Sequence, residues 1–234
     1  MRVENLHNHS TFSDGIFTPE DIILYAISCD LEGIGISDHY STKKVRSVIH
    51  LEKYFKELNY LKNKYGEDIR IYSGLEIDFS PRSDVYGLIS NIELLMDYCD
   101  YLLFEYVADT DNKGYGIEDF FKTRELLSDI PVGLAHTFIE KNIIPRSPDL
   151  ALRLCNGNVF IELCSGNRNL YNGVPNFIES FDFIIANKDL LKFSAGSDTH
   201  RDLREVELAE EALDFIRRNQ LHQFSPEIKI HPSH

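Results

Sequence analysis

Residues 2–39 read RVENLHNHSTFSDGIFTPEDIILYAISCDLEGIGISDH, and they contain a complete strand-helix-strand unit. The runs RVENLH and GIGIS are short and carry aliphatic residues, which favours strands. Between them, PEDIILYAISCD places apolar residues at the three- and four-residue spacing of a helix. Two strands joined through a helix normally pair in parallel. The stretch therefore predicts a β-α-β unit.

The same alternation occurs seven times along the chain. The remaining strand-like runs are IRIYSGLEI (69–77), YLLFEYV (101–107), PVGLAH (131–136), VFIELC (159–164) and KFSAGS (192–197). The helix-like segments that follow the later strands cover 48–66, 85–98, 117–127, 148–155, 176–189 and 206–218. Seven such units close more readily into a barrel than they remain an open sheet. We predict an α/β fold, a (β/α)7 barrel like a TIM barrel, as a single domain over residues 1–234 with a peripheral tail, FSPEIKIHPSH (224–234).

The formal net charge of -14 argues against non-specific binding to nucleic acid or to anionic membranes, since such binding requires an excess of Lys and Arg. No run approaches the roughly 20 apolar residues of a spanning helix. The first residues, MRVENLHNHS, include no apolar signal segment, so we expect a cytoplasmic protein. The four cysteines form no CxxC pair, which predicts neither a disulfide framework nor a zinc knuckle, and we expect three of them in the core.

Polar residues stand at the ends of all seven predicted strands. In strand order these residues are His7 and His9, Asp38 and His39, Glu76, Glu105, His136, Glu162 and Cys164, and Asp198 and His200. The carboxyl ends of parallel barrel strands meet around one mouth, so we expect these side chains to converge. Residues two apart in a strand point to one face, which lets His7 and His9 bind one ion while Asp14 on the next loop reaches a neighbouring ion.

Each of these residues alone also has an ordinary structural explanation. Isolated histidines are usually hydrogen-bonded core residues, which we expect for His50, His222, His231 and His234, and Ser-Asp pairs often cap helices. A ring of unpaired charges at one mouth would, however, be costly unless cations compensated it. Imidazoles and carboxylates without thiolates suit Zn, Mn or Fe better than Ca or Mg. Nine candidate ligands exceed the needs of two ions, so we predict three divalent transition metal ions.

The segments HNHSTFSDG, SDH, GLEID, LAHT and SDTH, in this order and at these spacings, closely resemble the motifs of the polymerase and histidinol phosphatase (PHP) superfamily. The resemblance extends from residue 3 to about residue 206. It implies a distorted (β/α)7 barrel with a trinuclear metal site at the carboxyl ends of the strands. It also implies that the chain hydrolyses phosphoesters.

Carried over residue by residue, the resemblance implies three sets of ligands. The first ion would be held by His7, His9, Glu76 and Asp198, the second by Glu76 as a bridge with Glu105 and His136, and the third by Asp14, His39 and His200. Many relatives have histidine in place of Glu105 and asparagine in the segment that contains Cys164. Glu105 remains a competent oxygen ligand that favours Mn or Fe. Cys164 is either a ligand, a residue that supports a ligand or a small buried filler, and the last two roles are favoured.

The predicted chemistry follows from the ions. A water bridging two ions has its pKa lowered from 15.7 toward roughly 7, which supplies a nucleophile without a Ser or Cys side chain. Glu76, as the bridge, would support this water. The proton for the leaving group would come from metal-bound water, Asp14 or His200. Arg168 and Arg201 follow strand ends and either bind the phosphate bidentately or remain surface arginines.

We therefore predict a metal-dependent phosphoric ester hydrolase that acts on a small phosphorylated molecule. The acidity of the chain favours a small-molecule phosphomonoesterase similar to histidinol phosphatase, with histidinol phosphate as one candidate substrate. The alternative is a PHP-type nuclease or nucleotide phosphodiesterase, which requires a basic or aromatic groove. A non-catalytic, metal-stabilised module is the third reading.

Overall fold

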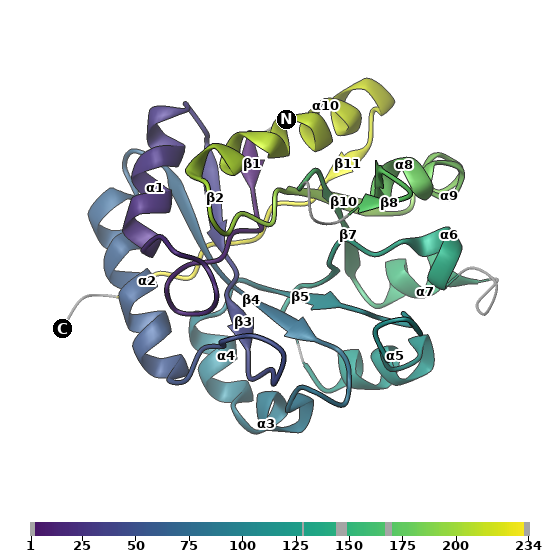
Figure 1. The fold of residues 1–234 in the computed structure, drawn as a ribbon, viewed down its shortest axis with the longest axis horizontal. Helices are drawn as coiled ribbons and strands as arrows, with labels where there is room; N and C mark the ends of the chain where they lie inside the picture. The colour runs from purple at the N-terminus through teal and green to yellow at the C-terminus, as the bar shows by residue number, and fades with distance from the viewer. Residues whose placement is uncertain (1–2, 128, 144–148, 167–169, 232–234) are drawn as a thin grey trace.

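The computed structural model describes residues 3–127, 129–143, 149–166 and 170–231. Eight parallel strands follow one another in its main sheet in the order β1-β2-β4-β5-β6-β7-β10-β11 (Figure 1). Their bounds are β1 Glu4–Asn5, β2 Gly33–Ile36, β4 Arg70–Asp78, β5 Tyr101–Glu105, β6 Val132–Leu134, β7 Val159–Cys164, β10 Lys192–Gly196 and β11 His222–Gln223. A further short strand, β3 (His39–Tyr40), also pairs with β4. All seven predicted strand runs contain one of these strands.

The first and the last of the seven predicted strands, β1 and β10, come together. The Leu6 N–H donates to the Ala195 carbonyl, and the Asp198 N–H donates to the His7 carbonyl, each at 2.9 Å. These bonds join the chain after β1 to β10 and curl the sheet into a barrel. The barrel is distorted because β1 contributes only two residues to its regular ladder. The predicted distorted (β/α)7 barrel is therefore confirmed.

Helices surround the sheet on its outer side (Figure 1). Their bounds are α1 Pro19–Ser28, α2 Leu51–Tyr65, α3 Val85–Ser90, α4 Ile92–Tyr98, α5 Ile117–Glu125, α6 Ile139–Asn142, α7 Leu150–Asn156, α8 Asn176–Glu179, α9 Phe181–Ala186, the 3-10 helix η2 Leu203–Leu208 and α10 Ala209–Asn219. A two-stranded hairpin, β8 (Leu170–Tyr171) with β9 (Val174–Pro175), precedes α8. None of the helices in the described ranges has both the length and the apolar composition needed to cross a bilayer.

Two segments predicted as single helices are each divided into two α-helices. The break in 85–98 falls at Asn91, whose side-chain amide donates to the Gly87 carbonyl at 2.7 Å and so competes with the regular helical bonds. The break in 176–189 falls at Ser180, whose hydroxyl accepts a backbone N–H from α6 at 2.9 Å. Apolar periodicity continues across both breaks, which is why the sequence predicts one helix in each place.

The interior of the barrel is filled by large side chains that face small ones. Tyr101 and Phe160 are buried there, and a Cβ atom at Gly35 or Gly133 would collide with the Tyr101 phenol or the Phe160 ring, respectively. The other members of this inner cluster are Leu6, Tyr72, Leu103, Ala135 and Phe224. Glycines in the strands thus make room for aromatic rings inside a narrow barrel.

The C-terminal segment contradicts the prediction of a peripheral tail. Phe224 is buried and stacks on Phe160, with 3.9 Å between ring centroids. The Lys229 N–H donates to Asp100 at 2.7 Å, and the buried Lys62 ammonium donates both to Asp100 at 2.6 Å and to the Lys229 carbonyl at 2.9 Å. Asp100 directly precedes β5, so residues 224–231 form a strap across the amino end of the barrel (Figure 1). The polar composition of the tail concealed this role.

Candidate metal centre

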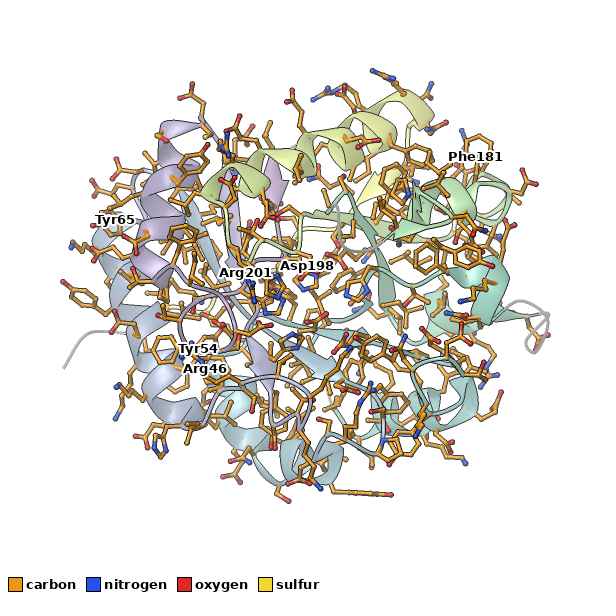
Figure 2. The ribbon with its side chains drawn as sticks, viewed as in Figure 1. Arg46, Tyr54, Tyr65, Phe181, Asp198 and Arg201 are labelled. Carbon is orange, nitrogen blue, oxygen red and sulfur yellow. The ribbon has the colours of Figure 1, made fainter. Side chains whose placement is uncertain are left out.

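The predicted site residues converge at the carboxyl ends of the strands. His7 and His9 follow β1, His39 opens β3, Glu76 lies in β4, Glu105 ends β5, His136 follows β6, and Asp198 and His200 follow β10. Asp14 lies on the loop between β1 and α1. Asp198 lies near the middle of the ring of strands in Figure 2. Eight of the nine candidate ligands form three groups whose donor atoms lie within 4.8 Å of one another.

The first group consists of His7, His9, Glu76 and Asp198. The Nε2 atoms of His7 and His9 lie 3.0 Å apart. Asp198 Oδ1 lies 3.4 Å from the former and 3.1 Å from the latter. All four side chains are nearly excluded from solvent. This group has the membership that the family resemblance implies for the first ion.

The second group consists of His39, Glu76 and Glu105. His39 Nδ1 lies 3.0 Å from Glu76 Oε2 and 3.7 Å from Glu105 Oε1. His136, which the resemblance placed here, lies 3.0 Å from Glu76 Oε1 but falls outside the 4.8 Å group. The structure thus brings His39 close to Glu105 and keeps His136 against the other oxygen of Glu76.

The third group consists of His9, Asp14, His39 and His200. Asp14 Oδ1 lies 3.1 Å from His200 Nε2, 3.7 Å from His9 Nδ1 and 3.8 Å from His39 Nε2. The resemblance implied Asp14, His39 and His200 without His9. One ring nitrogen of His9 therefore faces the first group and the other faces the third. In the same way, one nitrogen of His39 faces the second group and the other faces the third. These two histidines connect the three groups into one cluster.

Two donor atoms among the described residues of the cluster lack a hydrogen-bond partner, which a divalent cation would replace. Within the described part of the chain, Asp14 Oδ1 and His39 Nδ1 are buried without a hydrogen bond. Buried polar atoms normally have a partner, and a cation would supply one. The two facing Nε2 atoms of His7 and His9 can share at most one proton when both rings are neutral, whereas both can bind metal. The residues present therefore fit the metal ions that the resemblance implies.

Carboxylates hold protons on three of the histidines. Burial lowers the pKa of His7, but Glu162, Glu76 and Asp198 outweigh it and raise the pKa well above its ordinary value. Burial lowers the pKa of His9, but the neighbouring Asp198 and Glu76 outweigh it and raise the pKa to about 10. Burial also lowers the pKa of His136, and Glu76 reverses this effect and raises the pKa to about 9. A metal ion must displace these protons to bind, so metal affinity should fall as the pH is lowered.

Three further candidate ligands, Asp14, His39 and Glu105, differ in how their surroundings shift their pKa. Burial raises the pKa of Asp14, but His200 and two further imidazoles lower it to about 2, so this carboxylate is ionised near neutral pH. Burial lowers the pKa of His39 to about 4, which leaves a neutral imidazole suited to metal. Burial and the carboxylate of Glu76 raise the pKa of Glu105 well above its ordinary value. His136 offsets this rise only in part.

Two buried carboxylates hold the cluster in place from behind. Glu162 accepts from His7 Nδ1 at 2.7 Å and from the His136 N–H at 2.8 Å, which turns His7 Nε2 toward the cluster. Asp38 accepts from the backbone N–H groups of Ser10 and Ser13 at 2.8 and 3.0 Å. These bonds shape the loop that carries Asp14. The sequence placed Glu162 and Asp38 at strand ends, but their roles depend on contacts that it does not reveal.

Cys164 and Arg201 have no observed place in the cluster. Cys164 is buried at the end of β7 and belongs to none of the three groups found among the described residues. Arg201 is exposed, its N–H donates to Glu205 at 3.3 Å, and it does not line the cavity at the cluster. Arg168 lies outside the described residues. The predicted phosphate contact from Arg201 therefore stays a prediction.

The other histidines in the described part of the chain lie apart from the cluster. His50 and His222 are exposed, so the expectation that they are buried core residues is wrong. His231 is partly buried, and its Nε2 donates to the Asp97 carbonyl at 2.7 Å. His234 lies outside the described residues.

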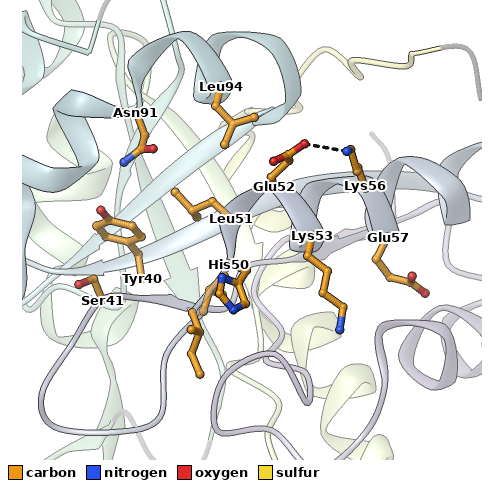
Figure 3. Close-up of a pocket in the computed structure, with 12 residues that line it drawn as sticks. Tyr40, Ser41, His50, Leu51, Glu52, Lys53, Lys56, Glu57, Asn91 and Leu94 are labelled. Atoms are coloured by element: carbon orange, nitrogen blue, oxygen red, sulfur yellow. Dashed lines mark hydrogen bonds and ion pairs between the residues drawn. The ribbon is translucent and has the colours of Figure 1, made fainter. Parts of the chain in front are cut away.

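A cavity of about 220 Å³ opens over the cluster. Seven candidate ligands line it, together with Thr42, Lys44, Val45 and Tyr106. The sequence did not indicate Lys44 or Tyr106, because neither belongs to a motif or shares a spacing with the ligands. A larger cavity of about 840 Å³ lies between the chain after β3 and helices α2 and α4 (Figure 3). Its walls contain none of the nine candidate ligands, so we place the chemistry in the smaller cavity.

The PHP domain model matches residues 5–127, which is more than half of the chain. The chain belongs to the PHP domain family. No curated protein matches its sequence. Membership of this family, together with the buried His, Asp and Glu groups, indicates that this PHP protein is a metal-dependent phosphoesterase.

Two solved structures resemble this PHP protein. A histidinol phosphate phosphatase from Lactococcus lactis, solved with zinc, L-histidinol and phosphate, is 17% identical with a TM-score of 0.66, over 97% of both chains. A protein from Listeria monocytogenes, proposed to be a histidinol phosphatase, is 16% identical with a TM-score of 0.64, over 86% of this chain and 96% of that one. At these identities the likeness shows the shared fold.

Proposed function

We propose that this PHP protein is a small-molecule phosphomonoesterase that uses up to three divalent transition metal ions. The observation that carries the proposal is the connected cluster of three donor groups at the floor of a small cavity. The Lactococcus protein of similar fold was solved with zinc, L-histidinol and phosphate, which makes histidinol phosphate the first substrate to test.

Glu76 is the centre of the proposed site because its two oxygens face different histidines. Oε1 lies 3.4 Å from His7 Nε2 and 3.0 Å from His136 Nε2. Oε2 lies 3.3 Å from His9 Nε2 and 3.0 Å from His39 Nδ1. These contacts support Glu76 as the carboxylate that would bridge two neighbouring ions, as the family resemblance implies.

We assign the nine side chains to three ions as the resemblance implies. His7, His9, Glu76 and Asp198 would hold the first ion; Glu76, Glu105 and His136 the second; and Asp14, His39 and His200 the third. When bound, divalent ions neutralise phosphate oxygens and make water a stronger nucleophile near neutral pH. The protein contributes a buried and rigid set of donors, held by Glu162 and Asp38, so little reorganisation is needed during the reaction.

We assign proton transfer at the leaving group to Asp14 and His200. Because Asp14 is ionised near neutral pH, it would relay a proton that it first accepts. Asp14 is the most exposed of the carboxylates in the three groups, with a quarter of its side chain accessible, and its Oδ1 lies 3.1 Å from His200 Nε2. Both residues line the cavity over the cluster. Water that enters this cavity meets them at its edge.

The size and charge of the site favour a small monoester over a nucleic acid. A cavity of about 220 Å³ suits a compact substrate, and Lys44 is the single Lys or Arg among its described lining residues. The net charge of -14 repels polyanions, whereas screening over roughly 10 Å at 0.1 M salt lets a small dianion approach.

The test is a substrate screen of purified protein supplied with Mn, Zn or Fe. The substrates are histidinol phosphate, an aryl phosphate, nucleotides and short oligonucleotides, with Glu76→Gln, purified and supplied with metal in the same way, as the control for contaminating phosphatases. We expect kcat/KM to be higher for monoesters than for oligonucleotides. Degradation of oligonucleotides without monoesterase activity would favour the nuclease alternative, and inactivity of fully metal-loaded protein on all substrates would favour the non-catalytic module.

A further inference from the structure

Lys44 stands at the mouth of the metal cavity with no carboxylate partner in the described chain. The charged residues that line this cavity besides the histidines are Asp14, Glu76, Glu105, Asp198 and Lys44. In a strongly acidic protein, a lysine beside a site for cations calls for an explanation, because bound ions would repel its ammonium. An anionic ligand in the cavity would supply one.

The backbone of Lys44 is held in position from two sides. The Lys44 N–H donates to the Thr42 hydroxyl at 3.2 Å, and the neighbouring Lys43 N–H donates to the Arg82 carbonyl at 3.0 Å. On the other side, the Arg46 guanidinium donates to backbone carbonyls of the loop that carries Asp14. The segment that carries Lys44 is thus tied to the loops on either side of the cavity.

The side chain of Lys44 reaches across the cavity to Tyr106, which directly follows Glu105. Its Nζ lies 4.6 Å from the centroid of the Tyr106 ring and hydrogen-bonds to the phenol oxygen. Arg82 also lies over this ring, at 5.1 Å, and is itself paired with Asp78 at 3.0 Å. Tyr106 therefore holds the ammonium at the cavity, while two of the three N–H groups of Lys44 remain for a ligand.

We propose that Lys44 binds the phosphoryl group of the substrate and selects monoesters over diesters. The inference rests on the proposed phosphoesterase function of the same site. The Lys44 side-chain amine donates a hydrogen bond to a non-bridging phosphate oxygen. A monoester brings two negative charges and a diester one, so a fixed ammonium stabilises the bound monoester more.

The chain offers a matched control in Lys43. It is the adjacent lysine of the same loop and is exposed like Lys44, but it does not line the cavity. Removal of either charge changes the net charge of the protein equally. A difference between Lys43→Met and Lys44→Met therefore reports the position of the charge.

The experiment measures phosphate binding and hydrolysis with metal-loaded protein. Inorganic phosphate is titrated by calorimetry into wild type, Lys44→Met, Lys44→Arg and Lys43→Met, and kcat/KM is measured for an aryl monoester and a diaryl diester. For Lys44→Met we expect phosphate affinity and monoester kcat/KM to fall about 10- to 100-fold, as for loss of a charge-assisted hydrogen bond, with a smaller fall for the diester. Lys43→Met should stay within about twofold of wild type, and Lys44→Arg should retain most of the affinity.

Metal content and melting temperature distinguish this role from a structural one. Both should be unchanged in Lys44→Met, because Lys44 is exposed and is not among the candidate ligands. Equal effects of the two Met variants, or loss of metal from Lys44→Met with unchanged phosphate affinity, would overturn the proposal. If wild type hydrolyses no ester yet binds phosphate through Lys44, the proposed function fails and the binding role stands.

Discussion

The side chains of the cluster differ in the number of other candidate ligands that they contact. Glu76 lies within ion-pair distance of four histidines, whereas among the described residues Glu105 lies within that distance of one, His39. Cys164 lies in none of the three groups. Their importance for metal binding should therefore decrease in the order Glu76, Glu105, Cys164.

We predict that Glu76→Gln abolishes most activity, because a neutral amide weakens the donor sets on both sides at once. Glu105→Gln should reduce activity in a way that excess metal partly restores. Cys164→Ser should change metal affinity by no more than the roughly 10- to 100-fold effect of a supporting residue. Metal content and kcat/KM across a metal titration test this order. If Cys164→Ser loses a full equivalent of metal while Glu105→Gln loses none, the assignment of the second ion is wrong.

The four cysteines differ in burial, and we expect them to differ in reactivity. Two of the four, Cys99 and Cys164, are buried, so the expectation of three in the core is wrong. Burial, assisted by the charge of Asp100, raises the pKa of Cys99 to about 12. In native protein we expect iodoacetamide to label the exposed Cys155 first and to leave Cys99 and Cys164 unlabelled until unfolding, as measured by peptide mass spectrometry. Rapid native labelling of Cys99 would contradict the packing described here.

Among the elements, the C-terminal strap stabilises the end of the barrel opposite the cluster. Phe224 inserts its ring against Phe160, and Lys229 is bonded to Asp100. The barrel interior is thus closed by aromatic packing at its amino end and open to the cavity at its carboxyl end. Substitutions in the strap should therefore change the stability of the protein without changing the chemistry at the cluster.

We predict that Phe224→Ala lowers the free energy of unfolding by about 3 to 5 kcal/mol, as expected for truncation of a buried aromatic ring. Activity per folded molecule should be retained. Ile230→Ala is the matched control, since Ile230 lies in the same strap but is 55% exposed, and its effect should stay within about 0.5 kcal/mol. Urea unfolding followed by circular dichroism measures both values, and equal effects would show that the strap does not pack as described.

At the scale of the whole molecule, the cluster links stability to pH and metal. In metal-free protein the pKa values of His9 and His136 are raised to about 10 and about 9. A raised pKa contributes stability that is complete below the unfolded value near 6.5 and is lost as the pH rises through the folded value. Metal binding instead releases these protons and strengthens as the pH rises.

We predict that the stability of the metal-free protein and the stabilisation added by metal change in opposite directions with pH. The melting temperature of chelated protein should fall between pH 6.5 and 9, and the stabilisation added by saturating Mn or Zn should grow over the same range. Differential scanning calorimetry with and without metal tests this. If complete metal removal leaves the melting temperature unchanged at every pH, the cluster does not bind ions in the folded state.

The strands and the meeting of the candidate ligands could be predicted from the sequence because both depend on local order. Runs such as VFIELC and KFSAGS carry the period and composition of strands, and polar residues such as Glu162 and Asp198 stand at or just after their carboxyl ends. Parallel strands place such ends at one mouth whatever the loops do. His7, His9, Glu76 and Asp198 therefore meet in the structure as the motifs imply.

Only the tertiary structure decided which groups support this site. Lys44 and Tyr106 are 62 residues apart and meet across the cavity, and residues 224–231 pack against the opposite end. Loops and tails carry no periodic pattern, so their contacts depend on the surfaces that the closed barrel presents. The sequence determined the barrel and its ring of ligands through periodicity and strand direction. The partners of those ligands, the lysine at the cavity and the strap that covers the amino end of the barrel were decided by packing between distant segments.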